Sequence, residues 1–230
     1  MREMPGLAGT LYVYAEWLMR FSAANILWFI ANLPLLFVLF SVYLNGFTEG
    51  FVWYLLPIAG LFPAVLVPST IALFATVREW IIQKDQRSIT KAYLFHAKAN
   101  YRKSLFSGIF LMGIWLVWLV DFYFFKAANG FFGLLFAFIG LFLFVCTLNF
   151  FSLSAHFDMT QRSLMKNAFY VTIGNPLLSL FILASNLAIF YVSTAKVLFL
   201  LPLFAASISA YLSFLAFYRF ALKTKKKITA

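Results

Sequence analysis

The sequence predicts an all-α membrane protein: a bundle of six transmembrane helices with one short interfacial helix on the cytoplasmic side. Of the 230 residues, 64% are hydrophobic and only 11% are charged, whereas a soluble domain is closer to half apolar and a quarter charged. The apolar residues form long continuous runs, whereas the strands of a membrane barrel alternate and are about 10 residues long. The apolar surplus is therefore expected to face lipid as helices.

Six apolar runs are long enough to cross a bilayer, whose core of about 30 Å requires roughly 20 helical residues. These runs lie near residues 22–44, 52–76, 104–125, 131–153, 169–192 and 197–219. The N-terminus lacks the short apolar core and small-residue cleavage site of a secretory signal, so the first run is expected to remain as a helix. We interpret residues 1–230 as a single integral membrane domain.

The basic residues gather in alternate loops, and their distribution predicts the orientation of the chain. With a cytoplasmic N-terminus, all but two of the 18 lysine and arginine residues lie on the inner side, and Lys126 and Lys196 lie outside. This asymmetry is the positive-inside pattern of membrane proteins, and it predicts that both termini are cytoplasmic. Anionic lipid headgroups then account for the net charge of +11. No nucleic-acid-binding motif accompanies the charge, so a nucleic-acid partner is not expected.

The basic segment of residues 77–103 is the one sizeable part predicted outside the membrane, and a short helix running to about Asn100 is expected within it, with Asp85 or Ser88 as its cap. Its basic side chains form one stripe on the helical wheel: Lys84, Arg87, Lys91, Lys98 and Arg102. The opposite side carries Ile89, Ala92, Tyr93 and His96. Such a helix suits the inner membrane surface. The stripe is expected to contact either anionic lipid or a cytoplasmic partner.

No cluster of side chains in the sequence indicates catalysis, a metal site or a cofactor. The two histidines lack the three or four ligands that a zinc site requires, and no nucleotide-binding glycine loop or nucleophile elbow is present. Cys146 is the single cysteine, which excludes an internal disulfide. The acidic residues outside the cytoplasmic segments are Glu49 and Asp121, both near the outer surface. An enzyme is therefore not expected.

Neutral polar side chains lie within the predicted spans and are expected to face the interior of the bundle, because an unpaired amide in hydrocarbon is costly. Asn25 and Asn32 share one face of the first span, and Asn175, Ser179 and Asn186 share one face of the fifth. Two roles remain open for these residues. They can join helices by hydrogen bonds, or they can line a polar cavity for a neutral solute such as a sugar.

The segment LFPAVLVPSTIALFATVREW, residues 61–80, belongs to the second predicted span and contains Pro63 and Pro68 in its first half. Proline removes a helical hydrogen bond and clashes with the preceding turn. The segment is thus expected to contain either a packing kink or a broken helix that forms a binding site. In the second case Ser69 and Thr70 are the candidate polar groups, because they lie nearest to the freed backbone.

Four short stretches carry a family resemblance. They are NILWFIANLPLL at 25–36, PSTIALFATVREW at 68–80, KANYRKSLFSG at 98–108 and the NP pair at 175–176. In these stretches the chain resembles the YesL-like family, bacterial membrane proteins of uncharacterised function, although Val67 stands where the family usually has glycine. The resemblance implies a bacterial plasma-membrane protein. Family members often accompany genes for carbohydrate uptake and degradation, and no catalytic residues are assigned to the family.

These observations favour a non-enzymatic accessory or regulatory component of carbohydrate uptake or utilisation. It would contact a sugar importer or another membrane protein through its helices and its basic cytoplasmic surface. The alternative is a small transporter or channel for a neutral solute, with an asparagine-lined path. A membrane enzyme is disfavoured, because paired acids or a serine–histidine set are missing from the predicted spans.

Overall fold

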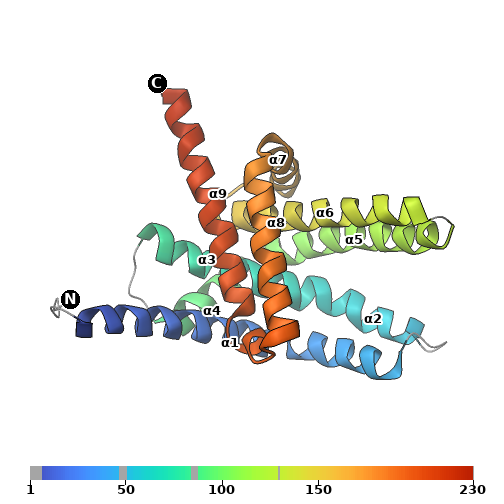
Figure 1. Cartoon of the computed structure of the whole chain (residues 1–230), viewed down its shortest axis with the longest axis horizontal. Helices are drawn as coiled ribbons and strands as arrows, with labels where there is room; N and C mark the ends of the chain where they lie inside the picture. The colour runs from blue at the N-terminus through green and yellow to red at the C-terminus, as the bar shows by residue number, and fades with distance from the viewer. Residues whose placement is uncertain (1–6, 47–50, 84–87, 129, 230) are drawn as a thin grey trace.

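The computed structural model describes residues 7–46, 51–83, 88–128 and 130–229, and every regular element in these ranges is helical (Figure 1). The α-helices are α1 (Leu7–Asn45), α2 (Phe51–Leu61), α3 (Val67–Arg78), α4 (Ile89–Ala99), α5 (Tyr101–Ala128), α6 (Gly130–His156), α7 (Gln161–Gly174), α8 (Pro176–Tyr191) and α9 (Ala206–Thr229). Short π-helical turns join or extend them: η1 (Phe62–Leu66), η2 (Glu79–Gln83), η3 (Val192–Lys196) and η4 (Leu201–Ala205). The prediction of an all-α fold is confirmed.

Among the residues that the structure describes, six helical stretches are long and apolar enough to cross a membrane, as the sequence predicts. They are Gly9–Asn45, Trp53–Ile82, Tyr101–Lys126, Gly130–His156, Pro176–Lys196 and Leu201–Lys223. The first begins well before residue 22, because Arg20 Nε and Nη2 donate hydrogen bonds of 3.1 and 2.5 Å to Glu16, one turn earlier. This pairing at i and i+4 lets the helix continue through two charged residues.

The fifth span differs from its predicted limits of 169–192. Residues 161–174 form the separate helix α7, and α8 begins at Pro176 after a break at Asn175, whose backbone has φ −137° and ψ 85°. The cause is local, because Pro176 has no N–H to donate to the preceding turn and its ring clashes with that turn. Asn175 Oδ1 accepts a hydrogen bond of 3.2 Å from the N–H of Leu178 and so caps the new helix.

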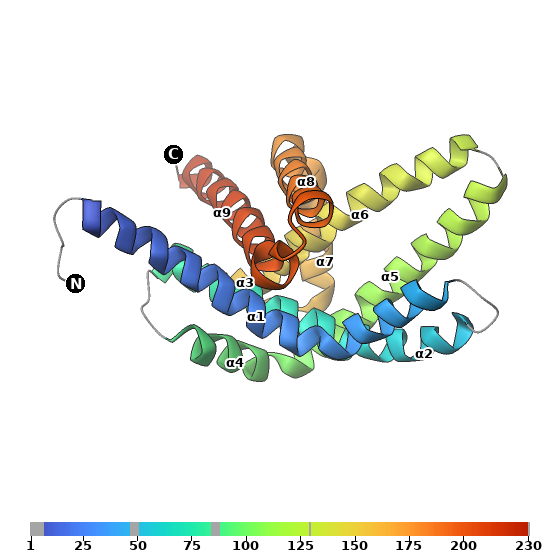
Figure 2. The ribbon, with the colours of Figure 1, turned by 60° about the horizontal axis from the view of Figure 1, so that its bottom comes forward.

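The helices form pairs that splay from a common centre. α5 and α6 lie side by side and project away from both chain termini (Figure 1, Figure 2). α8 and α9 form a second pair that runs at a steep angle to the first, and α2 folds back along the end of α1 (Figure 1). α4 lies beside α1 and α3 (Figure 2). The pairs meet around α3, which places the core of the protein at that helix.

α3 is the most enclosed element of the fold. Every residue from Val67 to Val77 except Thr70 is buried, and α1, α4, α5, α6 and α9 all pack against this helix. Of the 18 most apolar consecutive residues in the second span, 50% are buried, whereas the share in the first span is 11%. The segment 61–80 therefore forms the centre of the bundle, and the other spans present most of their apolar surface outward.

The two prolines of residues 61–80 do not break the backbone. Pro63 lies in η1, where the N–H of Val67 donates to the carbonyl of Phe62, five residues earlier. Leu66 and Val67 both keep right-handed helical angles, and residues 53–82 form one continuous helical stretch. The π-helical turn thus shifts the helical register at the prolines, and the chain stays helical on both sides.

Candidate functional site at the α4–α5 corner

The side of α4 opposite its basic residues packs against other helices of the protein. This side is therefore not available for contact with the membrane surface. Ala92 and Tyr93 are buried, and the hydroxyl of Tyr93 donates to the carbonyl of Ser69 at 3.4 Å. This burial raises the pKa of Tyr93 above its ordinary value. Leu94 and Phe95, both more than half exposed, lie on the outer side. The apolar groups that α4 offers to lipid or to a partner are therefore those beside its lysines.

A buried acid–histidine pair joins α4 to the end of the second span. His96 Nε2 lies 2.8 Å from Glu79 Oε1, and the two side chains are 11% and 9% exposed. Glu79 opens η2, so the pair anchors α4 to the helix that contains both prolines. The sequence analysis missed this pair because the partners are 17 residues apart, on elements whose packing no local pattern encodes.

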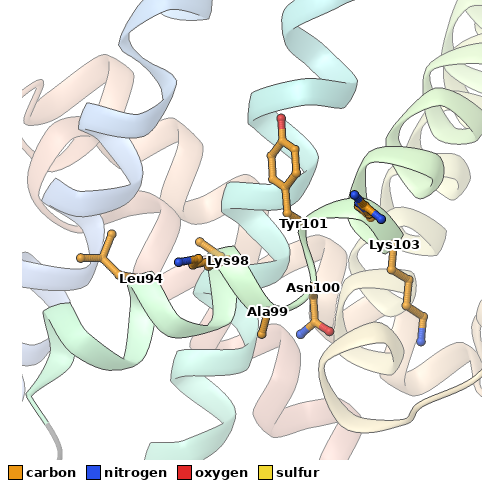
Figure 3. A pocket seen from close by; sticks show the side chains of 8 residues that line it. Leu94, Lys98, Ala99, Asn100, Tyr101 and Lys103 are labelled. Atoms are coloured by element: carbon orange, nitrogen blue, oxygen red, sulfur yellow. The ribbon is translucent and has the colours of Figure 1, made fainter.

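α4 and α5 meet at a corner, where a hollow of about 890 Å³ opens on the surface (Figure 3). The turn is made by Asn100, with φ −108° and ψ 10°. We call the lining residues the α4–α5 corner: Leu94, Ala97, Lys98, Ala99, Asn100, Tyr101, Arg102 and Lys103. Within the described residues, Lys98 and Arg102 are exposed and form no ion pair. The corner thus combines positive charge with exposed apolar surface.

Lys103 belongs to the corner but is engaged within the protein. Its side chain points away from that of Tyr101 (Figure 3), and its Nζ pairs with Asp158 in the loop after α6. The hydrogen bond and the charge of Lys103 lower the pKa of this exposed carboxyl. The carbonyl of Lys103 also accepts from Gln161 Nε2 at 3.0 Å, and Ser107 donates to Gln161 Oε1 at 2.6 Å. The first turn of α5 is therefore fixed to the start of α7.

Tyr101 connects the corner to residues 61–80 of the second span, which we call the proline segment. Ala64 lies four residues before Pro68, so an α-helix would pair its carbonyl with an N–H that proline lacks. The hydroxyl of Tyr101 donates to this carbonyl at 3.1 Å, and Figure 3 shows the ring directed toward the second span. The sequence indicated that the backbone is freed here, but it could not indicate that a tyrosine from another span would bind it.

Tyr101→Phe is expected to lower the free energy of unfolding by about 1 kcal/mol, because the carbonyl of Ala64 loses a hydrogen bond. Tyr123→Phe is the matched control, since Tyr123 lies on the same helix, is 79% exposed and has no hydrogen bond within the described residues. Unfolding of the purified proteins in detergent micelles measures the difference. Equal stability of the two variants would show that the Tyr101 hydroxyl does not support the proline segment.

The five residues of the predicted basic stripe do not share one helix. Lys91 and Lys98 are exposed on α4, whereas Arg102 belongs to α5, beyond the turn between the two helices. Lys84 and Arg87 lie outside the described residues. The helical wheel treated the segment as one continuous helix, but the chain changes direction before Arg102. The structure therefore brings Lys98 and Arg102 together at a corner instead of along a straight face.

The polar residues of the first and second spans bind one another. Asn32 Nδ2 donates to Ser69 Oγ at 2.9 Å, and Trp28 Nε1 donates to Thr70 Oγ1 at 3.0 Å. The two hydroxyls in turn donate to the carbonyl of Leu66, at 3.0 Å from Ser69 and 2.6 Å from Thr70. These side chains thus join α1 to the proline segment, in the manner of interhelical hydrogen bonds in membrane proteins.

The other buried asparagines join different pairs of helices. Asn25 Nδ2 donates to the carbonyl of Leu201 at 3.0 Å, and its Oδ1 accepts from the N–H of Ser207 at 2.9 Å. Asn186 of α8 donates through Nδ2 to Ser213 Oγ of α9 at 3.1 Å. Asn25 and Asn32 therefore share a face of α1 but contact different elements, and neither is joined to Asn186 by a hydrogen bond.

The remaining polar residues form hydrogen bonds at the break between α7 and α8. Asn175 caps α8, and the hydroxyl of Ser179 donates across the break to the carbonyl of Thr172 at 2.7 Å. Asn149 of α6, which the sequence analysis did not single out, donates to Thr172 Oγ1 at 3.0 Å. The continuous apolar run around Asn149 concealed its role, because only the packing of α7 on α6 brings Thr172 beside it.

The α4–α5 corner is the candidate site that the geometry supports best. Two further hollows, of about 410 and 270 Å³, have mainly apolar linings and include none of the asparagines named above. In the part of the chain that the structure describes, no three His, Cys, Asp or Glu side chains come together as a metal site would require. What the corner can do chemically is bind anions and apolar groups at a membrane surface.

Comparisons with known proteins agree with the family resemblance. A family described as "Protein of unknown function, DUF624" matches residues 21–122. The chain is 26% identical to "Uncharacterized protein YteU" of Bacillus subtilis (strain 168) over 227 residues, which cover 97% of this chain and 90% of that protein. It is 24% identical to "Uncharacterized protein YesL" of the same organism over 228 residues, covering 96% and 94% of the two chains. The chain is thus similar to YesL-like proteins over nearly its whole length.

The region matched by the family contains the candidate site. Residues 21–122 include the proline segment, α4 and the α4–α5 corner, whereas α6 to α9 lie beyond them. No solved structure matches this chain.

Proposed function

We propose that this YesL-like chain is a non-enzymatic accessory or regulatory component of a bacterial plasma membrane, associated with carbohydrate uptake or utilisation. Both termini lie in the cytoplasm, and the α4–α5 corner is the contact surface for anionic lipid headgroups and for a membrane partner such as a sugar importer. The observation that carries the proposal is the corner itself, where exposed Lys98 and Arg102 stand beside exposed Leu94 and Tyr101.

A surface of mixed basic and apolar side chains suits both proposed contacts. Anionic lipids of the inner leaflet attract nearby lysine and arginine residues by about 1 kcal/mol each. A protein partner would bury apolar anchors such as Leu94 and Tyr101 and leave the charges at the rim of the interface. The positive-inside distribution supports a cytoplasmic position for this corner.

The buried asparagines support an accessory role over transport. A polar path requires side chains that keep free hydrogen-bonding groups along one common cavity. Asn25 and Asn186 instead use their amide groups on different pairs of helices. The link to carbohydrate follows from the family resemblance, because YesL-like proteins often accompany carbohydrate genes.

Purification of the tagged chain in mild detergent from carbohydrate-grown cells tests the contact surface. The wild type is expected to bring down a subunit of a sugar importer, and the double variant Lys98→Glu/Arg102→Glu is expected to lose it. Lys126→Glu is the control, because Lys126 is exposed at the far end of the same helix, α5. Loss of the partner in both variants would indicate a general charge effect and contradict a specific role for the corner.

A second measurement separates the accessory role from transport. Deletion of the gene is expected to reduce sugar uptake, and the wild-type chain is expected to restore it while the double variant does not. Liposomes that contain the purified chain alone are expected to remain impermeable to the sugar. If such liposomes transport the sugar and the purified chain binds no membrane partner, the accessory function is wrong and the chain is a transporter.

A further inference from the structure

The ends of α3 and α6 meet the middle of α9 beside a second group of cationic and aromatic side chains. Phe74 of α3 packs against Phe151 of α6 with ring centroids 5.6 Å apart. About one turn further along each helix stand Arg78 and His156, and the charge of Arg78 acts on the histidine ring. α9 closes the group with Tyr218, whose ring centroid lies 5.8 Å from that of His156. This group is separate from the α4–α5 corner.

Both polar members of this group contain a buried nitrogen without a partner. Within the described residues, Arg78 Nε and His156 Nδ1 are enclosed by protein and form no hydrogen bond. Buried polar nitrogens are almost always paired, and leaving a charged one unpaired is the costlier case. Two such atoms on adjacent helices therefore indicate that a group from outside the described part of the chain binds here.

The acidic side chains that adjoin this group along the chain are already engaged elsewhere. Glu79, the next residue after Arg78, binds His96 at 2.8 Å. Asp158, two residues after His156, binds Lys103. The positive charge of Arg78 is thus not neutralised by its acidic neighbours in sequence, and the missing partner must itself be an anion with acceptor oxygens.

We propose that Arg78 and His156 form a binding site for a phosphate group. The guanidinium fork matches the oxygens of a phosphate with two parallel donors, and the Nδ1–H tautomer of His156 supplies a third donor from the neighbouring helix. The ends of membrane helices lie at the depth of lipid headgroups, where phosphate is abundant. The site binds the phosphate either of an anionic lipid or of a soluble phosphomonoester, because the donor set recognises the same chemistry in both.

Binding by the purified full-length protein in uncharged detergent tests the site. Native mass spectrometry measures retention of added phosphatidylglycerol, and a thermal shift measures the response to glycerol phosphate without lipid. The wild type is expected to respond to one of the two probes, which identifies the source of the phosphate. Arg78→Gln is expected to weaken that response at least about tenfold, because it removes a charge-assisted hydrogen bond.

Three further variants make the result specific. Arg78→Lys keeps the charge but loses the fork, so intermediate binding is expected, and it serves in place of Arg78→Gln if that variant does not fold. His156→Gln is expected to weaken binding severalfold. Arg102→Gln removes one positive charge from the α4–α5 corner and is expected to leave binding unchanged, which separates this site from the proposed function. No response of the wild type to either probe, or equal responses of the wild type and both Arg78 variants, would overturn the proposal.

Discussion

Gly108→Ala is expected to lower the free energy of unfolding by about 1–3 kcal/mol, the usual range for overpacking. A Cβ at residue 108 would stand 2.6 Å from Pro63 Cα and 2.9 Å from both its Cβ and its carbonyl oxygen. Two of these atoms are backbone, and Pro63 lies in the π-helical turn η1. Neither the ring nor the turn can move aside cheaply, so α5 must separate from the second span.

Gly113→Ala is the matched control on the same helix, because nothing lies within 4 Å of the Cβ that it would add. Replacing a helical glycine by alanine gains about 1 kcal/mol of helix propensity at either position. The difference between the two variants therefore isolates the contact with Pro63. Unfolding of both proteins in the same micelles measures this difference. If Gly108→Ala is as stable as Gly113→Ala, the close approach of α5 to η1 is wrong.

Asn25→Leu is expected to lower the free energy of unfolding by about 2–4 kcal/mol, because two buried backbone groups lose their partner. Asn25 is fully buried. Its amide accepts from the N–H of Ser207 at 2.9 Å and donates to the carbonyl of Leu201 at 3.0 Å. Both groups lie in or beside η4, and leucine can supply neither the acceptor nor the donor of the lost amide.

Asn45→Leu provides the comparison for Asn25→Leu. Asn45 lies on the same helix, but it is exposed and its amide donates to the carbonyl of Ser41 at 2.8 Å and to Tyr54 at 3.1 Å. Water can replace these contacts, so a loss of less than about 1 kcal/mol is expected. The pair also tests the role of the asparagines. Full stability of Asn25→Leu combined with a loss of sugar uptake would indicate that Asn25 lines a path instead of joining helices.

The fifth span shows which helix limits can be predicted from local features of the sequence. The hydropathy pattern predicted one span at residues 169–192, and this range does contain the whole of α8. The sequence also shows Asn175 followed by Pro176, a pair that is typical of a helix start. Hydropathy gives no weight to this signal, so the break was absorbed into the span. The capping bond from Leu178 to Asn175 could have been predicted from those two residues alone.

The α4–α5 corner shows the opposite case. The basic character of the segment was clear from the sequence, and so was its position between two spans. The sequence also predicted a helix that ends near Asn100, and α4 ends at Ala99. The helical wheel nevertheless extended the basic stripe past this end to Arg102, which lies on α5. The turn at Asn100 forms because α5 must follow its own path against the second span, where Tyr101 binds Ala64 and Gly108 meets Pro63.

The sequence by itself determined the class of this protein: an all-α fold, helices long enough to cross a membrane and a resemblance to the YesL-like family. These properties follow from the length and continuity of apolar runs and from short motifs, all of which are local along the chain. The tertiary structure alone decided which polar groups meet. Asn25 meets Ser207 and Glu79 meets His96 because separate helices pack around α3. Such pairings depend on the directions of the helices and on their register. The hydrophobic pattern of a lipid-facing helix hardly constrains either property, because any apolar face can contact lipid.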